Sequence, residues 1–260
     1  MLKTLFLLLY LISFSAICSA EKPLKVVLFS GHTTIPEKDG CTSDSGIKEF
    51  VFNDEIVKII ANSKEKDIEF IPVFATENII LEERMKKTVE LEADIYVEIH
   101  HDSAQPEIIE KAKSCAQTRS TWVKLSGFSV FFSSENPEKE LSKELAETLA
   151  KWMKAAGVLP NLYHALPVAG ESKKIVDRSI GLYDNDFFVL KNNTIPAALV
   201  EIGVIVNPFE EAHLKKPETK NWVARAIKKA IREFAKKSKL TIQKNKRFPE
   251  DTDGKQVKTE

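Results

Sequence analysis

Hydrophobic residues fall into two patterns that alternate along the chain. Short, nearly continuous apolar runs are typical of strands buried on both faces, whereas apolar residues repeated every three or four positions are typical of amphipathic helices. The short runs cover residues 24–29, 69–74, 94–100, 127–132 and 197–204. The helical spacing covers residues 47–61, 81–89, 141–152 and 222–234.

This alternation predicts the fold class. Strands separated by helices of this length indicate an α/β protein, a single three-layer domain whose largely parallel sheet is covered by helices on both faces. We expect residues 24–236 to form this domain, with a loop-rich stretch at 158–186 where Pro, Gly and Asn gather. Beyond Lys236 the residues are mostly Lys, Asp, Thr and Gln, which predicts a disordered charged tail over 237–260.

Residues 1–20 have the pattern of a secretory signal peptide. Lys3 precedes an apolar run from Leu5 to Ile17, and small residues up to Ala20 precede a polar boundary. The run is shorter than the roughly 20 apolar residues that a membrane span requires. We therefore expect cleavage after Ala20, no membrane span in the mature protein, and a periplasmic or extracellular location.

Composition narrows the class of protein. Hydrophobic residues make up 43% of the chain, and 38 basic residues balance 38 acidic ones. These values are typical of a globular protein and give no sign of the basic surface that nucleic-acid binding requires. We expect a monomer that does not bind nucleic acid.

Two cysteines, Cys41 and Cys115, remain after removal of the signal peptide. An even number of cysteines in an oxidising compartment is consistent with a disulfide bond. Two free or buried thiols are the other interpretation, and the sequence leaves both open.

Two of the five histidines follow predicted strands. His32 comes directly after the first strand and His100 ends the third, so both lie at the sheet edge where ligands collect. Glu49 falls in the first turn of the intervening helix. Two histidines and one glutamate leave a fourth position open, which is typical of catalytic zinc sites. Spacing alone leaves open that these residues are structural or solvated.

Glu201 is an acidic residue inside the apolar run 197–204. A buried carboxylate is costly unless it is paired, hydrogen-bonded or neutral. One interpretation is a buried ion pair with Arg84 or Arg178. The other is a general base that takes a proton from the attacking water and returns it to the leaving amine.

Five segments resemble the zinc-dependent N-acetylmuramoyl-L-alanine amidases of the Amidase_3 type, over roughly residues 25–234. They are Gly31-His32, the stretch around Glu49, Leu81–Arg84, Ala93–His100, and Ala198–Gly203 with Asn207-Pro208. The resemblance implies Zn²⁺ bound by His32, Glu49 and His100, with Glu201 as the catalytic carboxylate. It further implies peptidoglycan, in the form of muramyl peptides, as the substrate.

The sequence departs from this family at three places. Thr33-Thr34 follow His32 where the family usually has two glycines, so the loop is built differently. His101-Asp102 follow His100 where the family tends to have a small residue and Asn, which leaves His101 open as the ligand instead. Glu98 replaces a small residue, and either supports His100 or faces solvent.

Residues 102–126 form an insertion relative to compact family members. Residues 108–116 within it are either a lid over the metal or a surface loop. Arg84 resembles a family arginine that orients Glu201 or a substrate carboxylate, and a helix-surface ion pair is the alternative. We interpret His164 and His213 as structural or exposed.

The sequence therefore predicts hydrolysis of the amide bond between N-acetylmuramic acid and L-alanine by a zinc-activated water. Two alternatives stay open: a zinc hydrolase of another cell-wall peptide bond, and a catalytically silent peptidoglycan-binding regulator. A protein activator is compatible with either enzyme.

Overall fold

The computed structural model describes residues 22–114, 122 and 124–247. The strands are β1 Leu24–Ser30, β2 Ile68–Val73, β3 Ile95–Asp102, β4 Ser129–Phe132, β5 Lys174–Asp177, β6 Leu182–Asp184 and β7 Ala197–Val204. The α-helices are α1 Glu49–Ala61, α2 Leu81–Glu90, α3 Pro106–Ser114, α5 Lys139–Ala155, α6 Phe188–Lys191, α7 Pro208–Leu214 and α8 Pro217–Arg247. Two short 3₁₀ helices are η1 Ala75–Glu77 and η2 Tyr163–Ala165.

The seven strands form one mixed sheet in the order β2-β1-β3-β7-β4-β6-β5. The pairs β1–β2, β1–β3, β3–β7 and β4–β6 are parallel, whereas β4–β7 and β5–β6 are antiparallel. The predicted largely parallel sheet is therefore confirmed, with the antiparallel pairs in the half that contains β4, β5 and β6.

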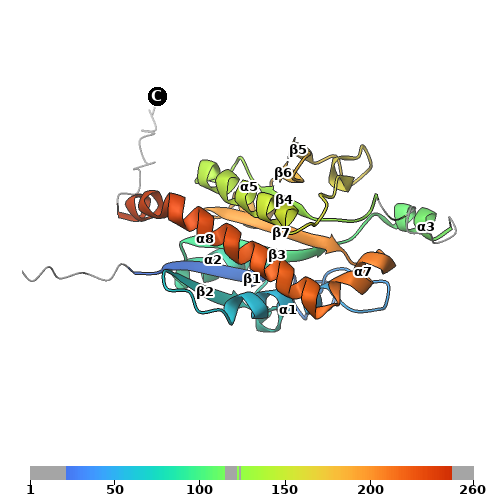
Figure 1. The fold of residues 1–260 in the computed structure, drawn as a ribbon, viewed down its shortest axis with the longest axis horizontal. Coiled ribbons are helices and arrows are strands. Elements are labelled where there is room, and N and C mark those ends of the chain that lie inside the picture. The colour runs from blue at the N-terminus through green and yellow to red at the C-terminus, as the bar shows by residue number, and fades with distance from the viewer. Residues whose placement is uncertain (1–21, 115–121, 123, 248–260) are drawn as a thin grey trace, which may run out of the picture.

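Helices cover both faces of the sheet, as the alternating pattern predicts (Figure 1). On one face α1, α5 and α8 pack on the larger core, to which they contribute Phe52, Leu149 and Ile227. On the other face α6 and α2 cover a smaller core that includes Leu190 and the partly buried Met85. The three-layer domain is confirmed.

The sheet faces are set by the alternation of side chains along β3. Val97 and Ile99 belong to the larger core, and Tyr96 belongs to the smaller one. Glu98 and His100 therefore share the face of Tyr96. Because β1, β3 and β7 are adjacent and parallel, their carboxyl ends meet at one edge of the sheet, where the predicted site residues gather.

Two predicted boundaries differ from the structure. The stretch 158–186, expected to be loop-rich, contains β5 and β6, which at four and three residues are too short to give a clear hydrophobic pattern. Helix α8 continues to Arg247, so the disordered tail predicted from residue 237 is wrong for residues 237–247.

Helix α8 extends because adding a residue to an existing helix forms a hydrogen bond without a new nucleation cost. Ser238 on the extension is buried, and its hydroxyl lies 3.4 Å from Glu144 on α5. Lys237 also pairs with Glu233 one turn earlier, at 2.7 Å.

The predicted signal peptide and residues 248–260 lie outside the described residues, so these parts of the interpretation stay predictions.

Candidate active site

His32 and Glu49 meet at the carboxyl end of β1. His32 has a left-handed backbone conformation, with φ of 68°, which turns the chain sharply after the strand. Its Nε2 lies 3.0 Å from Glu49 Oε2. Glu49 is the first residue of α1, where the partial positive charge of the helix N-terminus favours a carboxylate.

The Glu49 carboxylate bridges the two histidines predicted as ligands. Its Oε1 lies 3.0 Å from His100 Nδ1, and the backbone amides of Cys41 and His101 donate to its two oxygens at 3.2 Å. Burial opposes ionisation, but the hydrogen bonds from His100 and His32 outweigh it and hold the pKa of Glu49 well below its usual range. Glu49 is therefore an ionised acceptor.

His100 is oriented by a buried carboxylate. Its Nε2 lies 3.0 Å from Glu98 Oε1, while Glu98 also contacts the guanidinium of Arg84 and the hydroxyl of Tyr96. Burial raises the pKa of Glu98, but the Arg84 charge and the His100 hydrogen bond lower it to about 2. Burial lowers the pKa of His100, but its hydrogen bonds to Glu49 and Glu98 outweigh burial and hold that pKa well above its usual range, so both ring nitrogens donate to carboxylates. Because Glu98 holds the Nε2 proton, Nδ1 is the nitrogen that would lose its proton to bind a metal.

Arg84 connects the two histidines, because it contacts both Glu98, the partner of His100, and the backbone of His32. Its Nη2 donates to the carbonyl oxygen of His32 at 2.8 Å, and its side chain is only 4% exposed. Because the buried Arg84 pairs with Glu98 instead of Glu201, the predicted orientation of Glu201 and the predicted surface ion pair are both wrong, whereas a role toward a substrate carboxylate stays a prediction. Of the two interpretations of Glu98, support of His100 is confirmed and exposure to solvent is excluded, since Glu98 is 2% exposed.

Glycine is required where the chain passes the His100 ring. A Cβ at Gly31 would lie 2.4 Å from His100 Cε1, closer than any real contact allows. A Cβ at Gly40 would lie 2.7 Å from Glu49 Oε2, and Gly40 also has a φ of +75°. The backbone therefore closes tightly around the histidine–glutamate cluster.

His32, Glu49 and His100 together could hold a metal ion. One ligand atom from each lies within 4.8 Å of the others, and the two imidazole rings are 4.9 Å apart. Three such donors suit a zinc ion that keeps a fourth position open.

His101, the alternative ligand, points to the opposite face of β3. Its Nδ1 lies 2.8 Å from Asn53 Oδ1, and its ring packs against Phe52 at a centroid distance of 5.4 Å. Burial lowers the pKa of His101 to about 3, so the ring is neutral and structural. The geometry therefore favours His100 over His101 as the ligand.

Glu201 lies beside the histidine–glutamate cluster. Its Cα is paired with that of His100 across β3 and β7. Its Oε2 is buried and has no hydrogen-bond partner among the described residues. Burial, and then the negative charge of Asp102, raise the pKa of Glu201 to about 8. Arg84 pairs with Glu98 and Arg178 is exposed, so the structure does not show the ion pair considered for Glu201.

Residues 26–233 match the protein family described as N-acetylmuramoyl-L-alanine amidase, Amidase_3. The chain belongs to this family. Members of this family hydrolyse the amide bond between N-acetylmuramic acid and L-alanine in peptidoglycan. This chain has the same activity. A search of the curated proteins finds no match.

Solved structures of amidases share the fold. An N-acetylmuramoyl-L-alanine amidase from Clostridium difficile 630 is 22% identical, with a TM-score of 0.64 over 83% of this chain and 98% of that chain. Ami1 from Mycobacterium smegmatis is 21% identical, with a TM-score of 0.63 over 82% and 97%. CwlD from Clostridioides difficile, solved with the GerS lipoprotein, is 18% identical, with a TM-score of 0.55 over 82% and 98%.

Sequence reasoning missed one cluster in this amidase. His164, interpreted as structural or exposed, is buried between Asp102 and Glu171, whereas His213 is exposed as expected. The carboxylates that face His164 lie 62 and 7 positions away in the sequence, so the pattern gave no signal.

The insertion after β3 contains α3, which stands at one end of the molecule (Figure 1). Ile108 and Ile109 of α3 pack beside Trp122 and Tyr163 in a small separate core. Neither the lid nor the surface-loop interpretation is decided by this packing. Cys41 has a free thiol in the structure and Cys115 lies outside the described residues, so the disulfide stays a prediction.

Proposed function

We propose that this chain is a zinc-dependent N-acetylmuramoyl-L-alanine amidase in which His32, Glu49 and His100 hold Zn²⁺ and Glu201 is the catalytic carboxylate. One observation carries the proposal: three metal donors lie within 4.8 Å of one another, beside a buried carboxyl oxygen that no described residue satisfies.

The donor chemistry fits zinc. Two neutral imidazoles and one carboxylate are the ligand types of open catalytic zinc sites, and Glu98 fixes the His100 tautomer as an outer hydrogen-bond partner does in such sites. When bound, Zn²⁺ supplies the Lewis acidity that polarises the scissile carbonyl and makes water acidic enough to attack it.

Glu201 moves the proton in the proposed reaction. Its carboxylate takes a proton from the attacking water as the new C–O bond forms at the lactyl carbonyl. The same carboxyl group then gives this proton to the alanine nitrogen as the C–N bond breaks. The products are a free lactyl carboxylate and a peptide with a free amino terminus. Burial of Glu201 favours its protonated form and so assists the second step.

Two observations support export to the cell wall. The N-terminal sequence pattern predicts a signal peptide cleaved after Ala20, and the peptidoglycan substrate of the family lies outside the cytoplasm. Of the helices in the described residues, none combines the length and apolar character of a membrane span. The lipoprotein bound to CwlD supports a protein partner for this chain as well.

The test combines zinc content with dye release from labelled peptidoglycan for three proteins: the wild type, Glu201→Ala and Glu69→Ala. Glu69 is an exposed glutamate on β2 and is the matched control. We expect one zinc per molecule in all three, with cleavage reduced about 100- to 10,000-fold only in Glu201→Ala.

Product masses separate the alternatives. Peptides that begin with L-alanine support the amidase, whereas cleavage elsewhere in the stem peptide indicates a different wall hydrolase. A wild-type protein that binds sacculi without zinc and without cleavage would leave the silent regulator as the function.

A further inference from the structure

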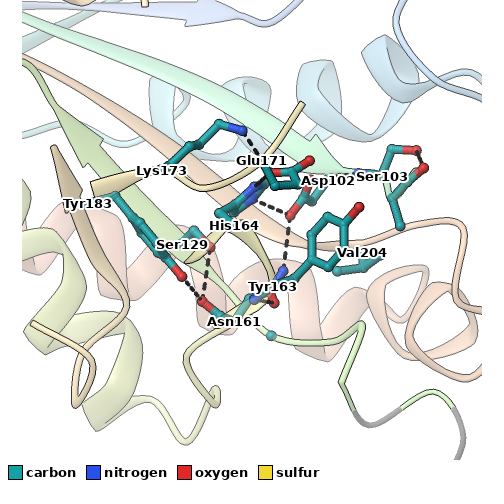
Figure 2. Close-up of polar contacts among 12 residues, drawn as sticks. Asp102, Ser103, Ser129, Asn161, Tyr163, His164, Glu171, Lys173, Tyr183 and Val204 are labelled. Atoms are coloured by element: carbon teal, nitrogen blue, oxygen red, sulfur yellow. Dashed lines mark hydrogen bonds and ion pairs between the residues drawn. The ribbon is translucent and has the colours of Figure 1, made fainter. Parts of the chain in front are cut away.

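A second group of charged side chains surrounds His164 (Figure 2). His164 Nδ1 is 2.8 Å from Glu171 Oε2, and His164 Nε2 is 2.7 Å from Asp102 Oδ2. The three side chains are each only 7–8% exposed. Lys173 Nζ lies 2.7 Å from Glu171 Oε2 and completes the row of charges. The proposed hydrolysis does not use this cluster.

The cluster shares a sheet face with Glu201. On β4, Ser129 is paired with Glu201 of β7, and Phe131 is paired with Leu199. The His164 ring packs against Phe131 at a centroid distance of 5.2 Å. Since side chains two positions apart lie on the same face, Glu201 and His164 are on the same side of the sheet.

The geometry requires a charged His164 ring. A neutral imidazole has one N–H, so one of its nitrogens would present a lone pair to a carboxylate oxygen at 2.7–2.8 Å. Burial opposes the charge, but Asp102 and Glu171 outweigh it and raise the pKa of His164 to about 10. The contact with Asp102 is not an aligned hydrogen bond and acts mainly as an ion pair. With both nitrogens against carboxylates, the ring cannot exchange protons with a substrate.

Asp102 lies directly after a β-bulge in the sheet. His100 is paired with Glu201, but two residues later Asp102 is paired with Val204, so β7 carries one extra residue directly after the catalytic pair. Such bulges near active sites redirect side chains. Asp102 is held beyond the bulge by His164 and by the side-chain amide of Asn161, which donates to Oδ2 at 3.0 Å.

We infer that His164 is a positioning residue: its charge holds Asp102 at the end of β3, directly beyond the bulge, and thereby keeps the ends of β3 and β7, which carry His100 and Glu201, in place. The inference rests on the proposed function of that pair. Without the cation, Asp102 is a buried carboxylate that lacks an ionic partner and moves toward water, whereas Glu171 keeps Lys173.

The test measures kcat, KM and zinc content for the wild type, His164→Gln and the double variant Asp102→Asn/His164→Gln. In His164→Gln we expect kcat to fall about 10- to 100-fold, with KM and zinc content within about twofold of wild type, because small misplacements of reacting groups mainly affect the chemical step. The double variant leaves no carboxylate without a cation. We therefore expect its kcat to be at least about tenfold higher than that of His164→Gln.

His213→Gln, the same substitution at an exposed histidine, is the control and should match wild type. Thermal unfolding distinguishes the positioning role of His164 from a purely structural one. With a purely structural role, the substitution would lower Tm while the folded enzyme keeps its kcat. Unchanged kcat in folded, zinc-loaded His164→Gln overturns the inference, and so does a double variant no faster than His164→Gln. If His164→Gln does not fold, His164→Lys is the second variant: it keeps a cation beside Asp102 and must keep kcat within about tenfold of wild type, and a larger loss in the folded variant overturns the inference. An inactive wild type would instead overturn the proposed function.

Discussion

Replacing Glu201 by glutamine removes a carboxyl group whose ionisation opposes folding. Burial and the Asp102 charge raise the pKa of Glu201 to about 8 in the folded protein, from an ordinary value of 4.5. The folded state therefore binds the Glu201 proton more tightly than the unfolded state does. The stability linked to this proton is fully present below pH 4.5 and is lost as the pH rises toward 8.

The size of the effect follows from the two pKa values. At pH 7.5 the carboxyl is ionised in the unfolded chain but mostly protonated in the folded one, which costs on the order of 4 kcal/mol at about 1.36 kcal/mol per pKa unit. Glutamine carries no such cost. For a domain of this size we expect Glu201→Gln to raise Tm at pH 7.5 by up to about 10 °C. At pH 4.5 the gain should fall below about 1 kcal/mol.

The assay is thermal unfolding of metal-free protein, prepared with a chelator, at pH 7.5 and pH 4.5. Metal must be absent because a bound cation would itself favour the ionised carboxylate. Glu69→Gln, at an exposed strand position, should show no change at either pH. A Tm of Glu201→Gln at or below that of wild type at pH 7.5, or an equal gain at both pH values, would refute the reasoning. The zinc-loaded variant should bind metal and fail to hydrolyse peptidoglycan.

Three further predictions concern the metal donors. Glu98→Gln should weaken zinc binding about 10- to 100-fold, measured by competition with a chromophoric chelator, because His100 loses its anionic partner; unchanged affinity would contradict that role. Gly31→Ala should abolish zinc binding in the folded protein, since the new Cβ would lie 2.4 Å from the His100 ring, and normal zinc content would show that the ring can move. His101→Gln should keep its zinc whereas His100→Gln loses it, as measured by metal analysis; the reverse result would exchange the two histidines.

The sequence predicted the local elements that carry the site. The apolar run before Ser30-Gly31 and the run ending at His100 were recognised as strands, and both are strands of the sheet. Glu49 was placed in the first turn of a helix and is the first residue of α1. These predictions succeed because periodicity reports directly which face of an element is buried.

Partners across the sheet lay beyond sequence reasoning. Arg84 was expected to orient Glu201 or a substrate carboxylate, or to form an ion pair on the helix surface. In the structure it contacts Glu98, fourteen positions away, and the carbonyl of His32, fifty-two positions away. The pattern gave apolar or polar character at each position but no distance between positions. The antiparallel pairing of β4 with β7 was not predicted either, because the sequence Gly127–Phe132 carries no signal of strand direction.

By itself the sequence determined the α/β class, the order of the longer strands and helices, and the residues that could bind metal, because these depend on hydrophobic periodicity and on side-chain chemistry along the chain. The tertiary structure decided which acidic side chain contacts which basic one. It assigned Glu98 to His100, left an oxygen of Glu201 without a partner, and enclosed His164 between Asp102 and Glu171. Charge pairing in a buried site depends on distances of about 3 Å, and only the packed sheet sets those distances.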